Sequence, residues 1–134
     1  MFPGSFDPFT EGHEAILRRL LPVFDRVVVA VGVNSDKQYM FSVDERTERI
    51  RQRMKDCPTV EVTSYTGMTI DLCHRLGAKV IVRGIRGPQD LEYEQTIAMV
   101  NHRLDPSIET LLLLADDEHK DISSTLEREK LMHR

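Results

Sequence analysis

The 134-residue sequence lacks the features of membrane, disulfide-bonded and nucleic-acid-binding proteins. It contains no apolar run of about 18 residues and no charged-then-apolar leader, so we expect no membrane partner and no signal peptide. Its two cysteines, Cys57 and Cys73, have no metal-ligand spacing, which indicates a reduced, cytoplasmic protein. The net charge is −4 without a Lys/Arg-rich block, so a nucleic-acid partner is not expected either.

Apolar strand-like stretches alternate with helical spacing along the whole chain. Strands are predicted at 26–32, 59–63, 79–83 and 109–115, after a very short first one at residues 1–2. No hairpin turn signal joins consecutive strands. The pattern predicts one α/β domain, residues 1–134, with a Rossmann-like, doubly wound, five-stranded parallel sheet and helices on both faces.

Helix-start signals lie between these strands. The Ser42-x-x-Glu45 capping box predicts a helix whose Val43, Ile50 and Met54 share a buried face, while its Glu and Arg positions face water. Asp90 is predicted as the N-cap of a later helix. In such a fold, ligands bind at the carboxyl ends of the strands. The polar stretches expected at that edge are residues 4–13, 34–38, 65–69, 83–90 and 116–124.

The stretch from Gly4 to His13 has the composition of a phosphate-binding loop followed by a helix. Glycines allow the backbone to approach an anion closely, and the first helical turn offers unpaired N–H groups and the positive end of the dipole. His13 falls in that first turn, where it can donate a hydrogen bond to a phosphoryl oxygen. Taken alone, the stretch fits a surface turn in which Thr10 caps the helix better than it fits an anion site, and the rest of the chain has to change that balance.

Two further stretches favour an anion site. Arg83 and Arg86 follow the fourth strand, and an arginine can bind phosphate bidentately, although an isolated one is usually a solvated charge. The stretch 122–125 starts a helix and is a second anion site or a simple cap. Together with Lys37 and His13, these groups suit a polyphosphate ligand.

Motifs of competing chemistries are absent. There is no Gly-x-x-x-x-Gly-Lys-Ser/Thr, which disfavours a P-loop ATPase, and no Gly-x-Ser-x-Gly elbow, which argues against an acyl-enzyme. No His/Cys/carboxylate cluster has the spacing of a structural zinc site. The remaining chemistry is direct phosphoryl or nucleotidyl transfer, in which the protein positions the reactants and neutralises charge.

Four spaced motifs closely resemble the bacterial phosphopantetheine adenylyltransferases over essentially the whole chain. The Gly-His and Ile-Ser-Ser elements are shared with the wider nucleotidyltransferase superfamily, whereas Thr10 and the blocks after the fourth strand are more specific. The motifs are Phe6-Asp7-Pro8-Phe9-Thr10-x-Gly12-His13, Arg83-Gly84-Ile85-Arg86, Asp90-Leu91-Glu92-Tyr93-Glu94 and Ile122-Ser123-Ser124-Thr125.

The resemblance implies transfer of AMP from ATP to 4′-phosphopantetheine, which gives dephospho-coenzyme A and pyrophosphate. It further implies Mg²⁺ held mainly by ATP oxygens and water, with no protein side chain as ligand. A homohexamer is implied as well, with Met99 and Val100 as candidate interface residues. Feedback binding of coenzyme A is left open.

The same resemblance assigns roles to individual residues. His13 would stabilise the pentacovalent transition state, and Lys37 with Arg83 would hold the attacking phosphate. The implied acceptor-binding residues are Ser5, Thr10, Lys37, Met68, Thr69 and Arg83. The implied ATP-binding residues are Ser5, Phe6, His13, Gly84, Ile85, Arg86, Glu94, His119, Lys120, Asp121, Ile122, Ser123, Ser124 and Thr125.

The chain departs from the family in three places. Charged Asp121 stands where an aromatic residue is usual, which leaves the adenine contacts there open. The family's first strand and last helix are longer, so both ends are expected to be incomplete. Two alternatives remain: adenylyl or cytidylyl transfer to another phosphate acceptor, and a non-catalytic nucleotide or coenzyme A sensor.

Overall fold

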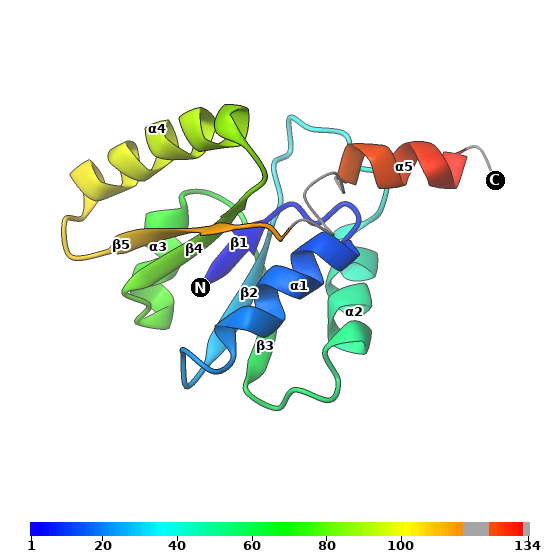
Figure 1. The fold of residues 1–134 in the computed structure, drawn as a ribbon, viewed down its shortest axis with the longest axis horizontal. Helices are drawn as coiled ribbons and strands as arrows, with labels where there is room; N and C mark the ends of the chain where they lie inside the picture. Colours follow the sequence, from blue (N-terminus) through cyan, green and yellow to red (C-terminus); the bar gives the residue numbers. More distant parts are fainter. Residues whose placement is uncertain (117–123, 133–134) are drawn as a thin grey trace.

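The computed structural model describes residues 1–116 and 124–132, in which strands and helices alternate along the chain (Figure 1). The predicted α/β class with parallel strands is therefore confirmed. The strands are β1 (Phe2–Gly4), β2 (Val27–Gly32), β3 (Val60–Tyr65), β4 (Val80–Ile85) and β5 (Glu109–Leu114). The helices are α1 (Glu11–Leu20), α2 (Val43–Arg53), α3 (Thr69–Leu76), α4 (Pro88–Leu104) and α5 (Ser124–Met132).

The predicted five-stranded sheet is confirmed only in part, because the strands form two parallel sheets of order β1-β2-β3 and β4-β5. The seam between them lies at Met1: its amino group donates to the Val80 carbonyl at 2.8 Å, and the Val82 N–H donates to the Met1 carbonyl at 2.9 Å. Further along the seam, Pro3 of β1 has no N–H to donate, and its carbonyl accepts a hydrogen bond from the Arg83 side chain. All strands still direct their carboxyl ends the same way, which positions the site.

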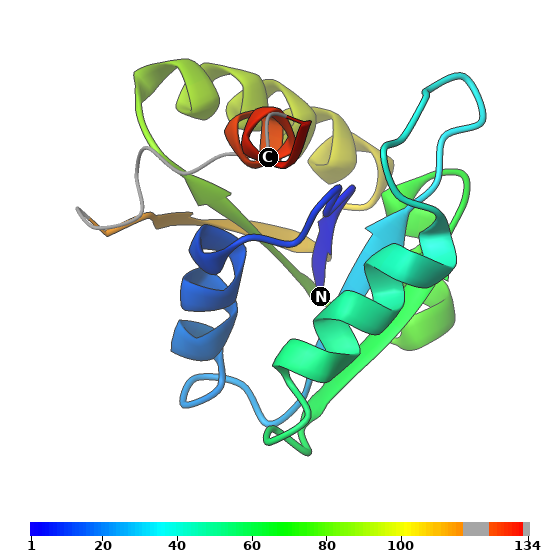
Figure 2. The same ribbon diagram turned by 90° about the vertical axis from the view of Figure 1, so that its right-hand side faces the viewer.

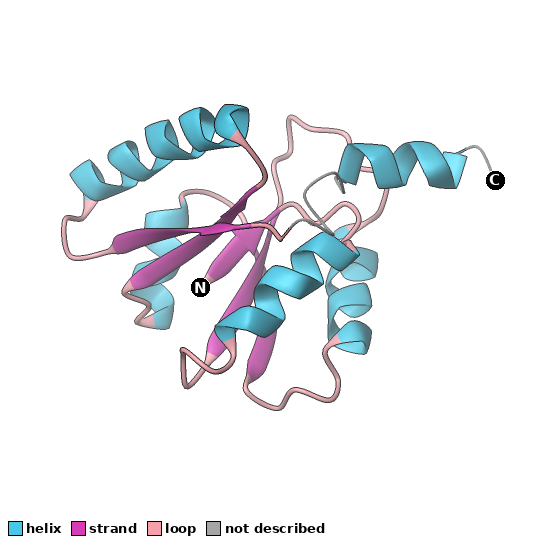
Figure 3. Cartoon of the chain, in the orientation of Figure 1, coloured by secondary structure: helices cyan, strands magenta, loops and turns pink. Residues whose placement is uncertain are grey.

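Helices flank the strands on both sides (Figure 3). The turned view places α1 and α4 on opposite sides of the strands (Figure 2). As predicted, β2 is buried: Val29 and Val31 are fully inaccessible to solvent and pack in the main core with Leu17 of α1. Of the helices in the described part of the chain, none is long and apolar enough to cross a membrane.

The start of α2 agrees with the sequence. Ser42 and Glu45 form the expected reciprocal capping box of α2, and Gly77 ends α3 in the left-handed conformation with φ = 69°. The prediction for Asp90 is wrong, since α4 begins at Pro88 with Gly87 as its N-cap. Proline at the first helical position needs no N–H partner, so the helix starts one turn earlier.

Candidate active site

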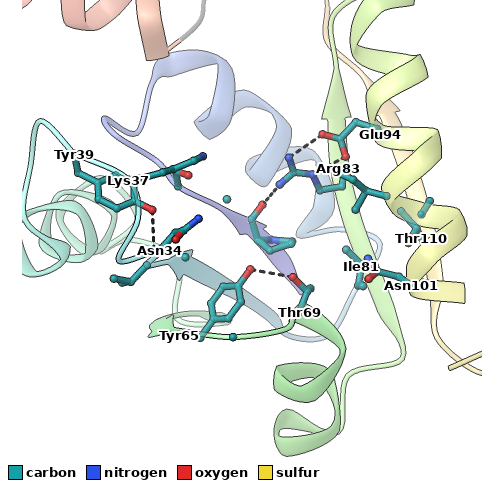
Figure 4. A pocket seen from close by; sticks show the side chains of 18 residues that line it. Asn34, Lys37, Tyr39, Tyr65, Thr69, Ile81, Arg83, Glu94, Asn101 and Thr110 are labelled. Carbon is teal, nitrogen blue, oxygen red and sulfur yellow. Dashed lines mark hydrogen bonds and ion pairs between the residues drawn. The ribbon is translucent and has the colours of Figure 1, made fainter. Parts of the chain in front are cut away.

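A cavity of about 260 Å³ opens at the carboxyl ends of the strands (Figure 4). It brings together five of the residues predicted from the sequence: Ser5, Lys37, Thr69, Arg83 and Glu94. Its other lining residues come from the ends of β1 to β3, the loops after them, and the facing surfaces of β4, β5 and α4. They are Pro3, Gly4, Gly32, Val33, Asn34, Tyr39, Tyr65, Gly67, Ile81, Ile97, Ala98, Asn101 and Thr110.

Arg83 is fixed on one wall of this cavity by Glu94 of α4. Its Nε and Nη2 donate to the two Glu94 carboxylate oxygens at 2.9 and 2.8 Å, and Nη1 donates to the Pro3 carbonyl. Burial alone would lower the pKa of Arg83, but the hydrogen bonds and charge of Glu94 outweigh it and raise that pKa. The side chain of Arg83 therefore stays charged in a set orientation, and Glu94 serves as its partner.

His13 is held at the first turn of α1 by Thr10. The Thr10 N–H donates to His13 Nδ1 at 3.0 Å, while the His13 N–H donates to the Thr10 hydroxyl at 3.2 Å. Nδ1 is thus an acceptor, and in the neutral imidazole the proton lies on Nε2. The ring packs edge-on against Phe6 at 5.0 Å and stacks on Phe9 at 5.7 Å between centroids.

The surroundings of His13 keep it neutral. Burial, followed by the positive charges of Arg83 and Arg86, lowers the pKa of His13 from 6.5 to about 4. His13 does not line the cavity, but the charges of both arginines act on its ring. At neutral pH the side chain therefore offers an Nε2–H donor without a positive charge of its own.

The structure places the other predicted residues less favourably for contact with a ligand. Thr10 is 6% exposed and its hydroxyl caps α1, while Met68 is 47% exposed and lies outside the cavity lining. Phe6 is buried in the core, and Gly84 packs against Ile16 of α1. None of these four residues lines the cavity.

Arg86 and Ile85 also lie outside the cavity lining. Ile85 is buried. The Arg86 backbone N–H and its Nε both donate to the Asp90 carboxylate at 3.0 Å. Asp90 therefore orients Arg86 at the end of β4 instead of capping α4.

Part of the predicted ATP-binding set lies outside the described residues: His119, Lys120, Asp121, Ile122 and Ser123. The described helix α5 begins at Ser124, and the side chains of Ser124 and Thr125 are likewise not described. Further along α5, Arg128 donates to the Asp7 carbonyl at 2.6 Å. Arg128 also lines a second hollow of about 300 Å³, which shares Ser5, Lys37 and Tyr39 with the first.

Two buried charged side chains near the cavity were not predicted. Asp7 is 4% exposed and accepts hydrogen bonds from the Met40 and Phe41 N–H groups, both at 2.9 Å. Arg46 is 2% exposed, so the prediction that the Arg positions of α2 face water is wrong there. Arg46 lies three residues after Val43 and four before Ile50, which is the spacing of a buried helix face and was a usable signal.

The chain resembles known proteins over nearly its full length. The model of the cytidylyltransferase-like family matches residues 1–130. A phosphopantetheine adenylyltransferase of Flavobacterium psychrophilum is 50% identical over 129 residues, which is 96% of this chain and 85% of that protein. Its namesake from Flavobacterium johnsoniae is 48% identical, covering 99% and 87% of the two chains. The one from Bacteroides fragilis is 46% identical, covering 98% and 87%. The chain is therefore a nucleotidyltransferase of the cytidylyltransferase-like family.

Proposed function

We propose that the chain transfers AMP from ATP to 4′-phosphopantetheine, giving dephospho-coenzyme A and pyrophosphate. The observation that carries the proposal is the meeting of Lys37 and Arg83 in one cavity, close to the neutral donor His13. Two cations suit the phosphate of an acceptor, and a nearby N–H donor suits the phosphoryl group it attacks. The two Flavobacterium relatives are named phosphopantetheine adenylyltransferases, which supports this choice of substrates.

The reaction is a direct in-line displacement. A phosphate oxygen of phosphopantetheine attacks the α-phosphorus of ATP, forming one P–O bond as the bond to the bridging oxygen of the β-phosphate breaks. The electron pair of that bond leaves with pyrophosphate, and no covalent enzyme intermediate forms. His13 Nε2–H donates to an α-phosphate oxygen as charge develops there, while Lys37 and Arg83 hold the acceptor phosphate beside it.

The ATP-side contacts proposed for Ser5, the 84–86 segment and the start of α5 rest on the resemblance and on their place at the same edge. In the described ranges no group of three or more His, Cys, Asp or Glu side chains could hold a metal ion. As the resemblance implies, a magnesium ion bound with ATP would be held mainly by phosphate oxygens and water. It would neutralise phosphate charge there.

Exposed apolar residues on α4 support a contact with a second copy of the chain. Met99, Val100 and Leu104 are all more than half exposed on this helix. The implied homohexamer, the cytoplasmic location and feedback by coenzyme A stay predictions.

The proposal is tested by coupling pyrophosphate release to a colour reaction. We expect release from ATP only when 4′-phosphopantetheine is present, with dephospho-coenzyme A identified by mass. Substituting CTP for ATP, or another phosphorylated acceptor for phosphopantetheine, identifies a related transfer. Ligand binding without pyrophosphate release under any combination would support a sensor and contradict the proposal.

A further inference from the structure

The Lys37 ammonium has no internal support of its own. Among the described residues it forms no hydrogen bond or ion pair, and its side chain is exposed on the loop after β2. Figure 4 shows it on the opposite side of the cavity from Arg83, which is bound to Glu94. The position of this amine therefore depends on what holds the backbone of residues 33–41.

Asp7 holds the far end of this loop. Its carboxylate comes from the β1–α1 loop and accepts the N–H groups of Met40 and Phe41, one on each oxygen and both at 2.9 Å. A buried carboxylate with two N–H donors fixes both peptide groups. Asp7 thereby joins the Lys37 loop to the loop that leads to His13.

Arg46 of α2 binds the same end of this loop and the ends of two strands. Its Nε donates to the Phe41 carbonyl at 3.2 Å, and Nη1 donates to the carbonyls of Ser5 and Gly32 at 2.8 and 3.0 Å. One planar guanidinium therefore connects the end of β1, the end of β2 and the end of the Lys37 loop. The guanidinium carbon of Arg46 also lies 4.0 Å from the centre of the Tyr39 ring.

Tyr39 closes the connection at the start of the loop. Its hydroxyl accepts the Asn34 N–H at 2.9 Å while its ring rests on Arg46. No carboxylate pairs with Arg46 in the described part of the chain, so backbone carbonyls and this ring alone satisfy the buried charge. A guanidinium used in this way orders backbone segments relative to one another, which a compact ammonium cannot do as well.

From these contacts we propose that Arg46 and Asp7 are positioning residues that set Lys37 at the acceptor phosphate. The inference rests on the proposed function only for the identity of that acceptor. Neither side chain needs to touch a substrate; both act through the backbone of residues 33–41.

The first test is a double-mutant cycle on the full chain with Arg46→Met and Lys37→Ala. Alone, Arg46→Met should lower kcat/KM for phosphopantetheine by about tenfold, because displacing a positioning group by a fraction of an ångström is costly. The KM for ATP should change less, within about twofold, since His13 is also held by its own contacts with Thr10. In the Lys37→Ala background the same substitution should have almost no further effect. Additive losses would overturn the inference.

Arg51→Met is the matched control, because Arg51 also lies on α2 and donates to a backbone carbonyl, that of Val62, away from the cavity. It should leave both kinetic constants unchanged. If Arg46→Met does not fold, Asp7→Asn carries the same cycle: it keeps the side-chain shape and loses one of two acceptor oxygens.

A second readout does not depend on the reaction. Amide hydrogen exchange of residues 34–41 should be faster in Arg46→Met and in Asp7→Asn than in Arg51→Met, with exchange in β2 unchanged. Equal exchange in all three variants would overturn the inference even if catalysis is as proposed. If no acceptor supports pyrophosphate release, faster loop exchange still establishes the positioning role, and the proposed function fails separately.

Discussion

His13 beside the cavity and Lys37 in its lining are held in place by different means. On the His13 side, the ring is fixed by Thr10, three residues away, and by the rings of Phe6 and Phe9. On the other side, Lys37 lies on a loop whose supports come from Asp7 and Arg46. The Asp7 contacts span 33 and 34 residues of sequence. The group proposed to act on charge in the transition state is thus held by neighbours in sequence, whereas the position of the group proposed to receive the acceptor phosphate depends on contacts between distant elements.

The largest effect is expected for substitution of His13. His13→Ala should lower kcat by about 10²- to 10³-fold, since removing one preorganised donor to a developing oxyanion costs about 3 to 4 kcal/mol. The KM for phosphopantetheine should change little, because the proposed role of His13 is on the α-phosphate of ATP. Steady-state pyrophosphate release measures both constants.

His102→Ala is a suitable control for this variant, since His102 is exposed on α4. It should retain full turnover. Full turnover in His13→Ala as well would mean that His13 has no role in the chemistry, and the proposed difference in role between His13 and Lys37 would be wrong.

A smaller effect is expected on the other side. Lys37→Ala should raise the KM for phosphopantetheine by about tenfold, as expected for one charge-assisted hydrogen bond of about 1.5 kcal/mol or more. The melting temperature should not change, because the ammonium has no partner in the described residues. Lys55→Ala, another exposed lysine, serves as control. A clear drop in melting temperature for Lys37→Ala alone would show that this side has internal support after all.

The α/β fold and the Thr10–His13 contact could both be predicted, because both depend on residues that are close together in the sequence. Alternating strand and helix patterns, the Ser42–Glu45 box and the Thr10–His13 helix start all depend on residues a few positions apart. The break between the sheets was not predicted, because it depends on how a three-residue β1 meets β4 across the fold.

The remaining site residues depend on distant contacts. Nothing adjacent to Arg83 in sequence indicates that Glu94 binds it, or that Pro3 supplies a third acceptor. Arg46 carried a local signal in its helical spacing, but its acceptors are the ends of other elements. Helical spacing predicts that such a residue is buried, but its hydrogen-bond acceptors depend on how distant elements pack.

The proposed role of His13 depends most directly on the protonation state of its ring. In ¹⁵N-histidine-labelled protein, with the His13 signals assigned by their loss in His13→Gln, a titration from pH 7.5 downward should show a neutral ring protonated at Nε2. Its midpoint should lie at a pKa of about 4, so that kcat shows no His13 titration between pH 6 and 8. A midpoint near 6.5, or a proton on Nδ1, would contradict a locally locked neutral donor.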